Sequence, residues 1–217
     1  MKLSHVILPA ILFAAVPPYI PEALAFPYKR QVGDLTVRAE QPIPDAIVPV
    51  AARAERLRHA SAIDEPGFGK RVFLTDGGWR WRWLTLTSSG AFGLTRALSG
   101  AIVINKSDIT HDRVFDGQAV GGTRSLSSVL AHEQTHGLIR ARYGPLADAR
   151  YPAWLREGYC DVVAGGGSLG DGEAEALLRA GTAHPAVMYW RGRRRAAAFL
   201  RAHHGSVDAL FASAAAW

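Results

Sequence analysis

The sequence has little of several residue types, and each shortage excludes a class of protein. Cys160 is its one cysteine, so no intrachain disulfide can form and a disulfide-stapled scaffold is excluded. Beyond an N-terminal run of eleven residues, no apolar stretch approaches the about 20 residues that a membrane-spanning helix needs. The net charge is only +6, from 25 Lys and Arg against 19 Asp and Glu, so we expect no nucleic-acid partner.

The residues that are present have an ordinary globular composition. Hydrophobic residues make up 48% of the 217 positions and charged residues 20%, which excludes intrinsic disorder. A chain of this length buries a sizeable core without disulfides or metals as staples. The composition therefore predicts a folded domain.

The N-terminus has the pattern of a secretory signal peptide. Lys2 precedes the apolar run 6–16, and Ala23 and Ala25 flank Leu24 in the small-x-small pattern of a cleavage site. We therefore expect 1–25 to be a signal peptide, 26–217 to be one domain, and the protein to be exported to the periplasm, the cell surface or the medium. The alternative is an uncleaved N-terminal membrane anchor.

Hydrophobic periodicity predicts strands early in the chain and helices later, which is typical of the α+β class. Alternation would place Trp79, Trp81 and Trp83 on one face of a strand. The expected strands lie within 31–39 and at 71–75, 79–87 and 101–105. The expected helices cover 45–60, 125–143, 152–164, 173–180, 186–203 and 207–214.

The chemistry of the chain is concentrated in the helix predicted over 125–143. It contains His132, Glu133 and His136 in the pattern H-E-x-x-H. Side chains four residues apart share one helix face, so both imidazoles can bind one metal ion. Glu133 lies about 100° round the helix, where it can reach a metal-bound water without being a ligand. In the alternative interpretation, the two histidines are core residues and Glu133 lies on the surface.

A third ligand and a supporting carboxylate lie in the next predicted helix. Glu157 is the candidate ligand, because a zinc ion held by two histidines needs at least one more protein group. The break at Gly144 and Pro145 allows the two helices to pack side by side. Asp161, four residues further on, shares the face of Glu157 and can accept the free N–H of a zinc-bound histidine.

These motifs resemble the gluzincins, which are zinc metallopeptidases related to thermolysin, and most closely the peptidase-MA-like group, in which H-E-x-T-H is followed by P-x-W-L-x-E-G. The resemblance covers 125–164. It implies His132, His136 and Glu157 as zinc ligands, Glu133 as general base, and Asp161 as support for the first histidine. It also implies an α+β, zincin-like fold: a small N-terminal mixed sheet with an edge strand at 101–105 lining the cleft over the active-site helix, followed by a mainly helical C-terminal part.

The activity that follows is hydrolysis of peptide bonds in a peptide or protein substrate by zinc-activated water. Two alternatives stay open: a catalytically weak or inactive zincin-like binding module, and a zinc amidase acting on a non-peptide or cell-wall amide. The sequence leaves the oligomeric state open.

Four side chains are candidates for stabilising the oxyanion: Tyr159, His184, Tyr189 and His203.

Two further features have a structural and a functional interpretation. Cys160 is expected in the core, with a metal ligand or a redox switch as the alternative. The arginines within 191–195 are expected on a solvated helix face, and the alternative is contact with an anionic membrane or cell-wall polymer.

Overall fold

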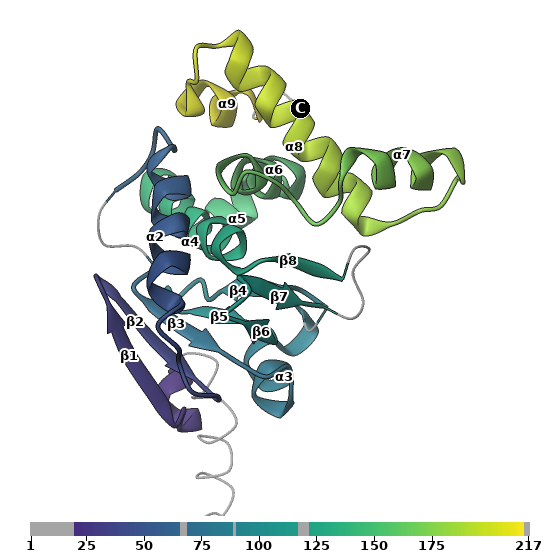
Figure 1. The fold of residues 1–217 in the computed structure, drawn as a ribbon. Coiled ribbons are helices and arrows are strands. Elements are labelled where there is room, and N and C mark those ends of the chain that lie inside the picture. Colours follow the sequence, from purple (N-terminus) through teal and green to yellow (C-terminus); the bar gives the residue numbers. More distant parts are fainter. Residues whose placement is uncertain (1–19, 66–68, 89, 117–121, 215–217) are drawn as a thin grey trace, which may run out of the picture.

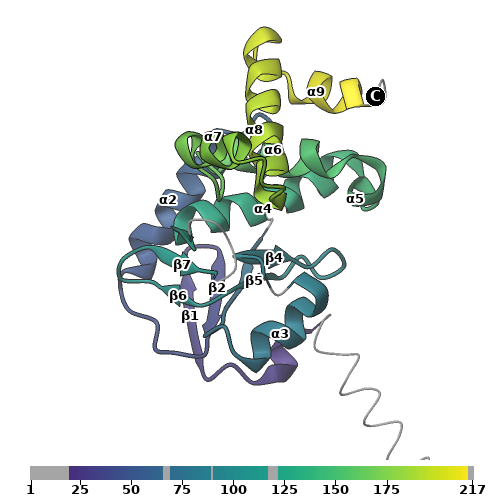
Figure 2. The same ribbon diagram turned by 90° about the vertical axis from the view of Figure 1, so that its right-hand side faces the viewer.

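The computed structural model describes residues 20–65, 69–88, 90–116 and 122–214. Its class is α+β, as predicted, with a small mixed sheet in the N-terminal half and a helical C-terminal part. Figures 1 and 2 show helix α4 (Leu126–Tyr143) running between the sheets on one side and the later helices on the other.

The main sheet has five strands within the described residues. They are β1 (Tyr28–Val32), β2 (Leu35–Ala39), β3 (Arg71–Leu74), β4 (Gly93–Thr95) and β5 (Ile102–Ile104), in the spatial order β1-β2-β3-β5-β4. The pairs β2–β3 and β3–β5 are parallel, whereas β1–β2 and β4–β5 are antiparallel. The sheet is therefore mixed.

The edge strand beside α4 is not the predicted one. The segment 101–105 forms β5, but β5 lies between β3 and β4 and all three of its residues are buried. A continuous buried run of β-branched residues is typical of an internal strand covered on both faces. The edge position belongs to β4, whose short Gly-Leu-Thr sequence carries no strand periodicity.

The tryptophan-rich segment 79–87 was predicted as a strand, and that prediction is wrong. It forms α3 (Trp79–Thr85) followed by the 3-10 turn η2 (Leu86–Ser88). Trp81, Leu84 and Thr85 are buried, a spacing of three and four, whereas Trp79 is 56% exposed. Tryptophans two apart fit a strand, but Trp79 and Trp83 are also four apart and fit a helix, so alternation alone did not decide between them.

A second, antiparallel sheet leads into α4. It consists of β6 (Ser107–Asp108), β7 (Arg113–Phe115) and β8 (Thr123–Ser125), none of which was predicted. Ser125 then begins α4 by accepting a hydrogen bond from the backbone N–H of Ser128, so the predicted N-cap is confirmed.

The predicted helices are present with ends shifted by a few residues. They are α2 (Ile47–His59), α4, α6 (Ala153–Val163), α7 (Asp171–Arg179), α8 (Pro185–Ala202) and α9 (Val207–Ser213), together with one unpredicted turn, α5 (Ala147–Arg150). Gly144, at a φ of 98°, ends α4 and starts the connection to α6.

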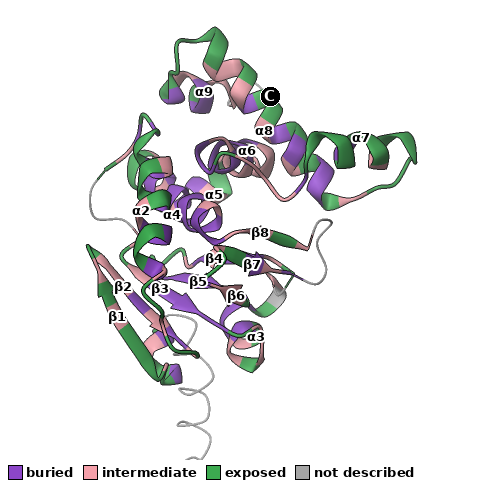
Figure 3. Cartoon of the chain, in the orientation of Figure 1, coloured by how far each residue is buried: buried purple, intermediate pink, exposed green. Residues whose placement is uncertain are grey.

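Helix α4 is buried on nearly every side because it separates two cores (Figure 3). Leu126, Val129 and Leu130 pack against the main sheet and α2. Leu138 and Ile139 pack against α6, α8 and α9. A helix that is buried all round is held on both faces, so the side chains of its central turns have fixed positions.

Two glycines bring α6 and α8 into close contact. A Cβ on Gly192 would lie 2.3 Å from the carbonyl oxygen of Trp154, and one on Gly158 would lie 2.4 Å from the carbonyl carbon of Gly192. Only glycine permits such an approach of two backbones. The middle of α8, around Gly192, is thereby held next to α6.

The described end of the predicted signal peptide packs on the main sheet. Leu24, in η1 (Pro21–Leu24), is buried against Phe73 and Trp81, and Glu22 forms an ion pair with Arg71 at 3.2 Å. Residues 1–19 lie outside the described residues, and cleavage after Ala25 stays a prediction. No helix in the described ranges is long and apolar enough to cross a membrane.

Candidate metal centre

Helix α4 directs His132 and His136 to the same side, one turn apart. Their ring centroids lie 5.0 Å apart, and both side chains are buried. The position follows from the helix itself, because residues at i and i+4 share a face.

Helix α6 brings Glu157 to the two histidines. Its Oε2 lies 3.3 Å from Nε2 of His132 and 3.5 Å from Nε2 of His136. The side chain of Glu157 stays 23% exposed. The structure therefore brings Glu157 next to both histidines that the sequence singled out with it as a ligand set.

Asp161 lies behind His132, one helical turn after Glu157. The Nδ1–H of His132 donates a hydrogen bond of 2.9 Å to Asp161 Oδ1. Arg124 donates to the same oxygen at 3.2 Å and to the carbonyl of Gly166 at 2.8 Å. Asp161 thus fixes the ring of His132 so that Nε2 points to Glu157, and Arg124 fixes Asp161.

The charges of this cluster stabilise one another. Burial disfavours the imidazolium form of His132, but hydrogen bonds to Asp161 and Glu157 outweigh it and raise its pKa to about 10. Burial alone would raise the pKa of the Glu157 carboxyl. The neighbouring His136 and His132 outweigh burial and hold that pKa well below its usual value. In the metal-free protein, a positive charge on His132 is therefore favoured opposite the Glu157 carboxylate.

A second combination of buried residues could hold a metal ion: the two histidines together with Cys160 in place of Glu157. The ligand atoms of His132, His136 and Cys160 lie within 4.8 Å of one another. Burial raises the pKa of the Cys160 thiol well above its usual value, and the neighbouring carboxylates of Glu157 and Glu133 raise it further. Cys160 is fully buried in the second core, as predicted.

Glu133 lies on the side of α4 that faces β4. It is 5% exposed, which contradicts the alternative that placed it on the surface. The hydroxyl of Thr95 lies 2.7 Å from Glu133 Oε2 and 2.6 Å from the Glu133 backbone carbonyl. A Cβ at Gly93 would lie 3.1 Å from Glu133 Oε1, so the absence of a side chain there leaves room for the carboxylate.

A cavity of about 740 Å³ connects these groups to the surface. Of the four candidates for the oxyanion, His184 and Tyr189 line it. Tyr159 does not: its hydroxyl bonds Ser61 at 2.6 Å within the core, where burial raises its pKa to about 12. His203 is also remote, since its ring stacks on Phe199 near the end of α8.

Several cavity residues were missed from the sequence. Thr95 and Gly93 come from the unpredicted strand β4, and Arg124 comes from the unpredicted strand β8. Arg140 and Arg156 also line the cavity and share the carboxylate of Asp148 at 2.8 and 3.2 Å. None of these residues has a local spacing that points to the site, because each reaches it through the tertiary fold.

The chain has no match among the known proteins to which it was compared. No family model, no curated protein and no solved structure matches it.

Proposed function

We propose that the protein is an exported zinc-dependent metallopeptidase that hydrolyses peptide bonds. The observation that supports the proposal is the distance from Glu157 Oε2 to Nε2 of His132 and to Nε2 of His136. Donors about 2.0–2.1 Å from a tetrahedral zinc ion are about 3.3–3.4 Å from one another. The two distances to Glu157, 3.3 and 3.5 Å, agree with that value.

The chemistry of the donors also fits zinc. Two imidazole nitrogens and one carboxylate are a ligand set of catalytic zinc sites, which keep a further position open. Because Asp161 occupies Nδ1 of His132, the nitrogen left for a metal is Nε2. Zinc in such a site polarises a carbonyl and lowers the pKa of its water towards about 7.

Glu157 is a better third ligand than Cys160. Its oxygen lies near both Nε2 atoms, and its side chain reaches the cavity. Cys160 belongs to the apolar core between α4 and α6, and three carboxylates nearby oppose formation of its thiolate. Since a thiol must lose its proton to bind zinc, Cys160 remains a core residue in this proposal.

Glu133 is the proposed general base. Thr95 holds one carboxylate oxygen, Oε2, and Glu133 itself lines the cavity beside the histidines. From there the carboxylate can take the proton of the attacking water and pass it to the leaving amine. Tyr189 and His184 are the two candidates that line the same cavity and can donate to the oxyanion.

A peptide can approach along β4. Within the described residues, β4 has no strand on its outer side, and Phe92, Gly93 and Leu94 line the cavity. An extended substrate can therefore add to this edge by main-chain hydrogen bonds. The zincin-like fold, proposed from the motifs, would use the strand in this way.

The test compares the wild-type chain with Glu133→Gln, both loaded with zinc. We expect hydrolysis of an unstructured protein such as casein by the wild type, and a loss of about 10²–10⁴-fold in the variant because the base is removed. Zinc content should be the same in both. Equal hydrolysis by the two proteins would contradict the role of Glu133. Turnover of cell-wall amides alone would instead identify the protein as an amidase. Zinc binding without turnover of any substrate would identify it as a binding module.

A further inference from the structure

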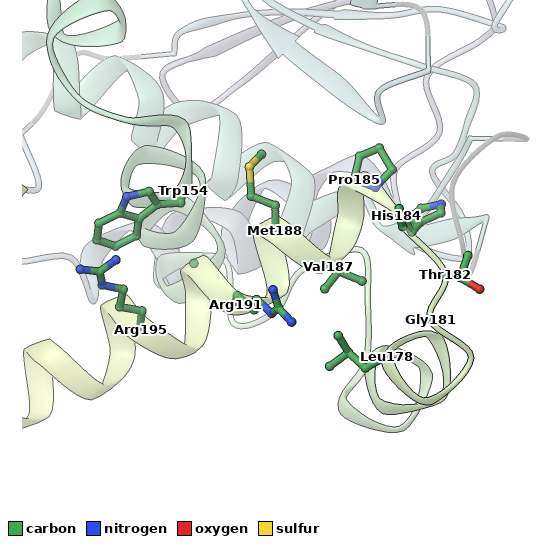
Figure 4. Close-up of a pocket in the computed structure, with 12 residues that line it drawn as sticks. Trp154, Leu178, Gly181, Thr182, His184, Pro185, Val187, Met188, Arg191 and Arg195 are labelled. Atoms are coloured by element: carbon green, nitrogen blue, oxygen red, sulfur yellow. The ribbon is translucent and has the colours of Figure 1, made fainter. Parts of the chain in front are cut away.

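A second cavity, of about 760 Å³, adjoins the metal cleft along α8, and we call it the α8 groove. His184 and Pro185 line both cavities, so the two are continuous at the N-terminal end of α8. Figure 4 shows His184 and Pro185 at one end of the groove and Trp154 with Arg195 at the other. A peptide bound in the cleft can therefore extend into the groove.

Helix α8 contributes side chains to both cavities. Tyr189 lines the metal cleft, whereas Val187 and Met188 line the groove. Gly192 also lines the groove, at the point where α8 lies so close to α6 that an added Cβ would be 2.3 Å from the carbonyl oxygen of Trp154. The contact between the two helices therefore fixes the groove relative to the cleft.

The walls of the α8 groove are mainly apolar. Leu178 and Val187 face each other across it in Figure 4, and Met188 and Trp154 add further apolar surface. Leu178 and Met188 are 38% and 43% exposed. Large apolar side chains exposed together in a concave site are typical of ligand-binding surfaces. Because covering them removes apolar surface from water, an apolar ligand is favoured over a polar one.

Charge does not select the ligand of the α8 groove. Arg195 stacks on the Trp154 ring, with its guanidinium carbon 3.9 Å from the ring centroid, and is not a free cation. Arg191 is exposed, as predicted for the arginine run, and has no ion-pair partner among the described residues. An ion pair formed at one exposed arginine contributes little to binding. The apolar walls therefore decide what the groove binds.

We propose that the α8 groove binds apolar side chains of the peptide substrate, in a stretch that continues out of the metal cleft. This inference rests on the proposed peptidase function and specifies its substrate class. Ten residues of helix separate Pro185 from Arg195, which correspond to about 15 Å along the helix axis. An extended peptide rises about 3.3 Å per residue, so the groove accommodates about four or five residues. The substrate is thus an unfolded chain with a run of apolar residues near the bond that is cut.

The test measures binding without turnover, in the full zinc-loaded chain carrying Glu133→Gln. The probes are three fluorescein-labelled peptides that differ only in containing Leu-Leu-Leu-Leu, Ser-Ser-Ser-Ser or Glu-Glu-Glu-Glu. We expect fluorescence anisotropy to show that the leucine peptide binds about tenfold more tightly than the serine peptide, because its binding removes apolar surface from water. The preference should persist as salt is added, since salt screens charges and not apolar contacts.

Substitutions at exposed positions locate the leucine preference. Leu178→Ser together with Met188→Ser should reduce it to about twofold, and both side chains are exposed enough for the fold to tolerate the change. Leu146→Ser is the matched control, because Leu146 is 75% exposed but lines neither cavity, and the preference should survive.

Three results of these titrations would overturn the proposal. The first is equal affinity of the parent protein for the leucine and serine peptides, and the second is tighter binding of the glutamate peptide than of the leucine peptide. The third is a leucine preference that stays the same in the Leu178→Ser and Met188→Ser double variant, because the apolar contacts would then lie outside the groove.

A second arm separates the peptide from other occupants of an apolar groove. Phosphatidylcholine vesicles with and without phosphatidylserine test a membrane, and analytical ultracentrifugation of the parent protein tests a second copy of the chain. Vesicle binding or dimerisation that is lost in the double variant, without any peptide preference, would overturn the proposal.

Casein hydrolysis by the wild type separates the groove from the peptidase function. Hydrolysis of casein without a leucine preference would overturn the groove assignment alone. A leucine preference in a protein that hydrolyses no peptide would support the groove and contradict the peptidase function.

Discussion

The metal cleft and the α8 groove share two lining residues, but they differ in whether their charged side chains have partners within the chain. In the cleft, His132 bonds Asp161 and approaches Glu157, and Asp161 in turn accepts from Arg124. In the groove, Arg191 forms no ion pair within the described ranges. Burial explains the difference, because a charge removed from water requires a partner. The cleft is thus fixed by its own charges, whereas the exposed Arg191 has no ion-pair partner among the described residues.

Both sites nevertheless depend on one helix pair. Helix α6 carries Glu157 and Asp161, and α8 carries Tyr189 for the cleft and Arg191 for the groove. The close approach of Gly192 to Trp154 sets how α8 lies on α6. Substitutions can therefore affect both sites, the cleft alone, or only the base within the cleft.

The largest effect is expected from Gly192→Ala, which should damage both sites. The new methyl group would lie 2.3 Å from a backbone oxygen, so α8 must move away from α6. We expect the free energy of unfolding to fall by about 1–3 kcal/mol, as for other overpacked cores. Denaturant unfolding measures the loss of stability, and zinc affinity and the peptide preference measure the damage to the two sites.

Gly172→Ala in α7 is the matched control for Gly192→Ala. Nothing lies within 4 Å of the methyl group it would add. Because alanine favours a helix by about 1 kcal/mol over glycine, this variant should be at least as stable as the wild type. A Gly192→Ala protein that matches it in stability and in zinc binding would contradict the role of the helix contact.

A smaller effect, confined to the cleft, is expected from Asp161→Asn. Loss of the carboxylate that orients a ligating histidine weakens metal binding by about 10–100-fold. Competition with a zinc-sensitive dye measures that change, and the peptide preference of the groove should stay the same. Asp148→Asn is the control, because Asp148 lines the same cavity but, among the residues that the structure describes, bonds only to Arg140 and Arg156. An equal loss of zinc affinity in both variants would contradict a specific role for Asp161.

The smallest effect is expected from Thr95→Val, which should alter the base and leave the metal in place. Hydrogen bonds to charged groups contribute about 1.5–3 kcal/mol, so kcat should fall by about tenfold or more when the Thr95 hydroxyl is removed from Glu133. Thr95→Ser keeps the hydroxyl and should retain most of the activity. Unchanged kcat in Thr95→Val, or lost zinc, would show that Thr95 does not act through Glu133.

The sequence predicted the cleft well where local spacing determines position. His132 and His136 share a helix face, and Glu157 and Asp161 share another, so two helices suffice to bring the four together. Ser125 and Gly144 mark the ends of α4 in the sequence as in the structure. Such signals depend on residues within a few positions of one another.

The sequence was insufficient where tertiary contacts decide. Strand β4 has three residues, one of them glycine, and gains its place as the edge strand by pairing with β5. Thr95 therefore reaches Glu133 from 38 residues away without a local signal. The tryptophans of α3 fit two periodicities, and burial of Trp81 and Leu84 in the core below the sheet decided for the helix. The α8 groove, likewise, joins residues of α6, α7 and α8.

The most direct test of the central claim is zinc stoichiometry, measured by elemental analysis on the purified full chain and on Glu157→Ala and Cys160→Ala. The account predicts about one zinc per wild-type chain, zinc lost or sharply weakened in Glu157→Ala, and zinc retained in Cys160→Ala, because the Glu157 carboxylate completes the site. Zinc lost in Cys160→Ala but kept in Glu157→Ala would contradict the assigned ligand set. No zinc in the wild type, even after reloading, would contradict the metal centre itself.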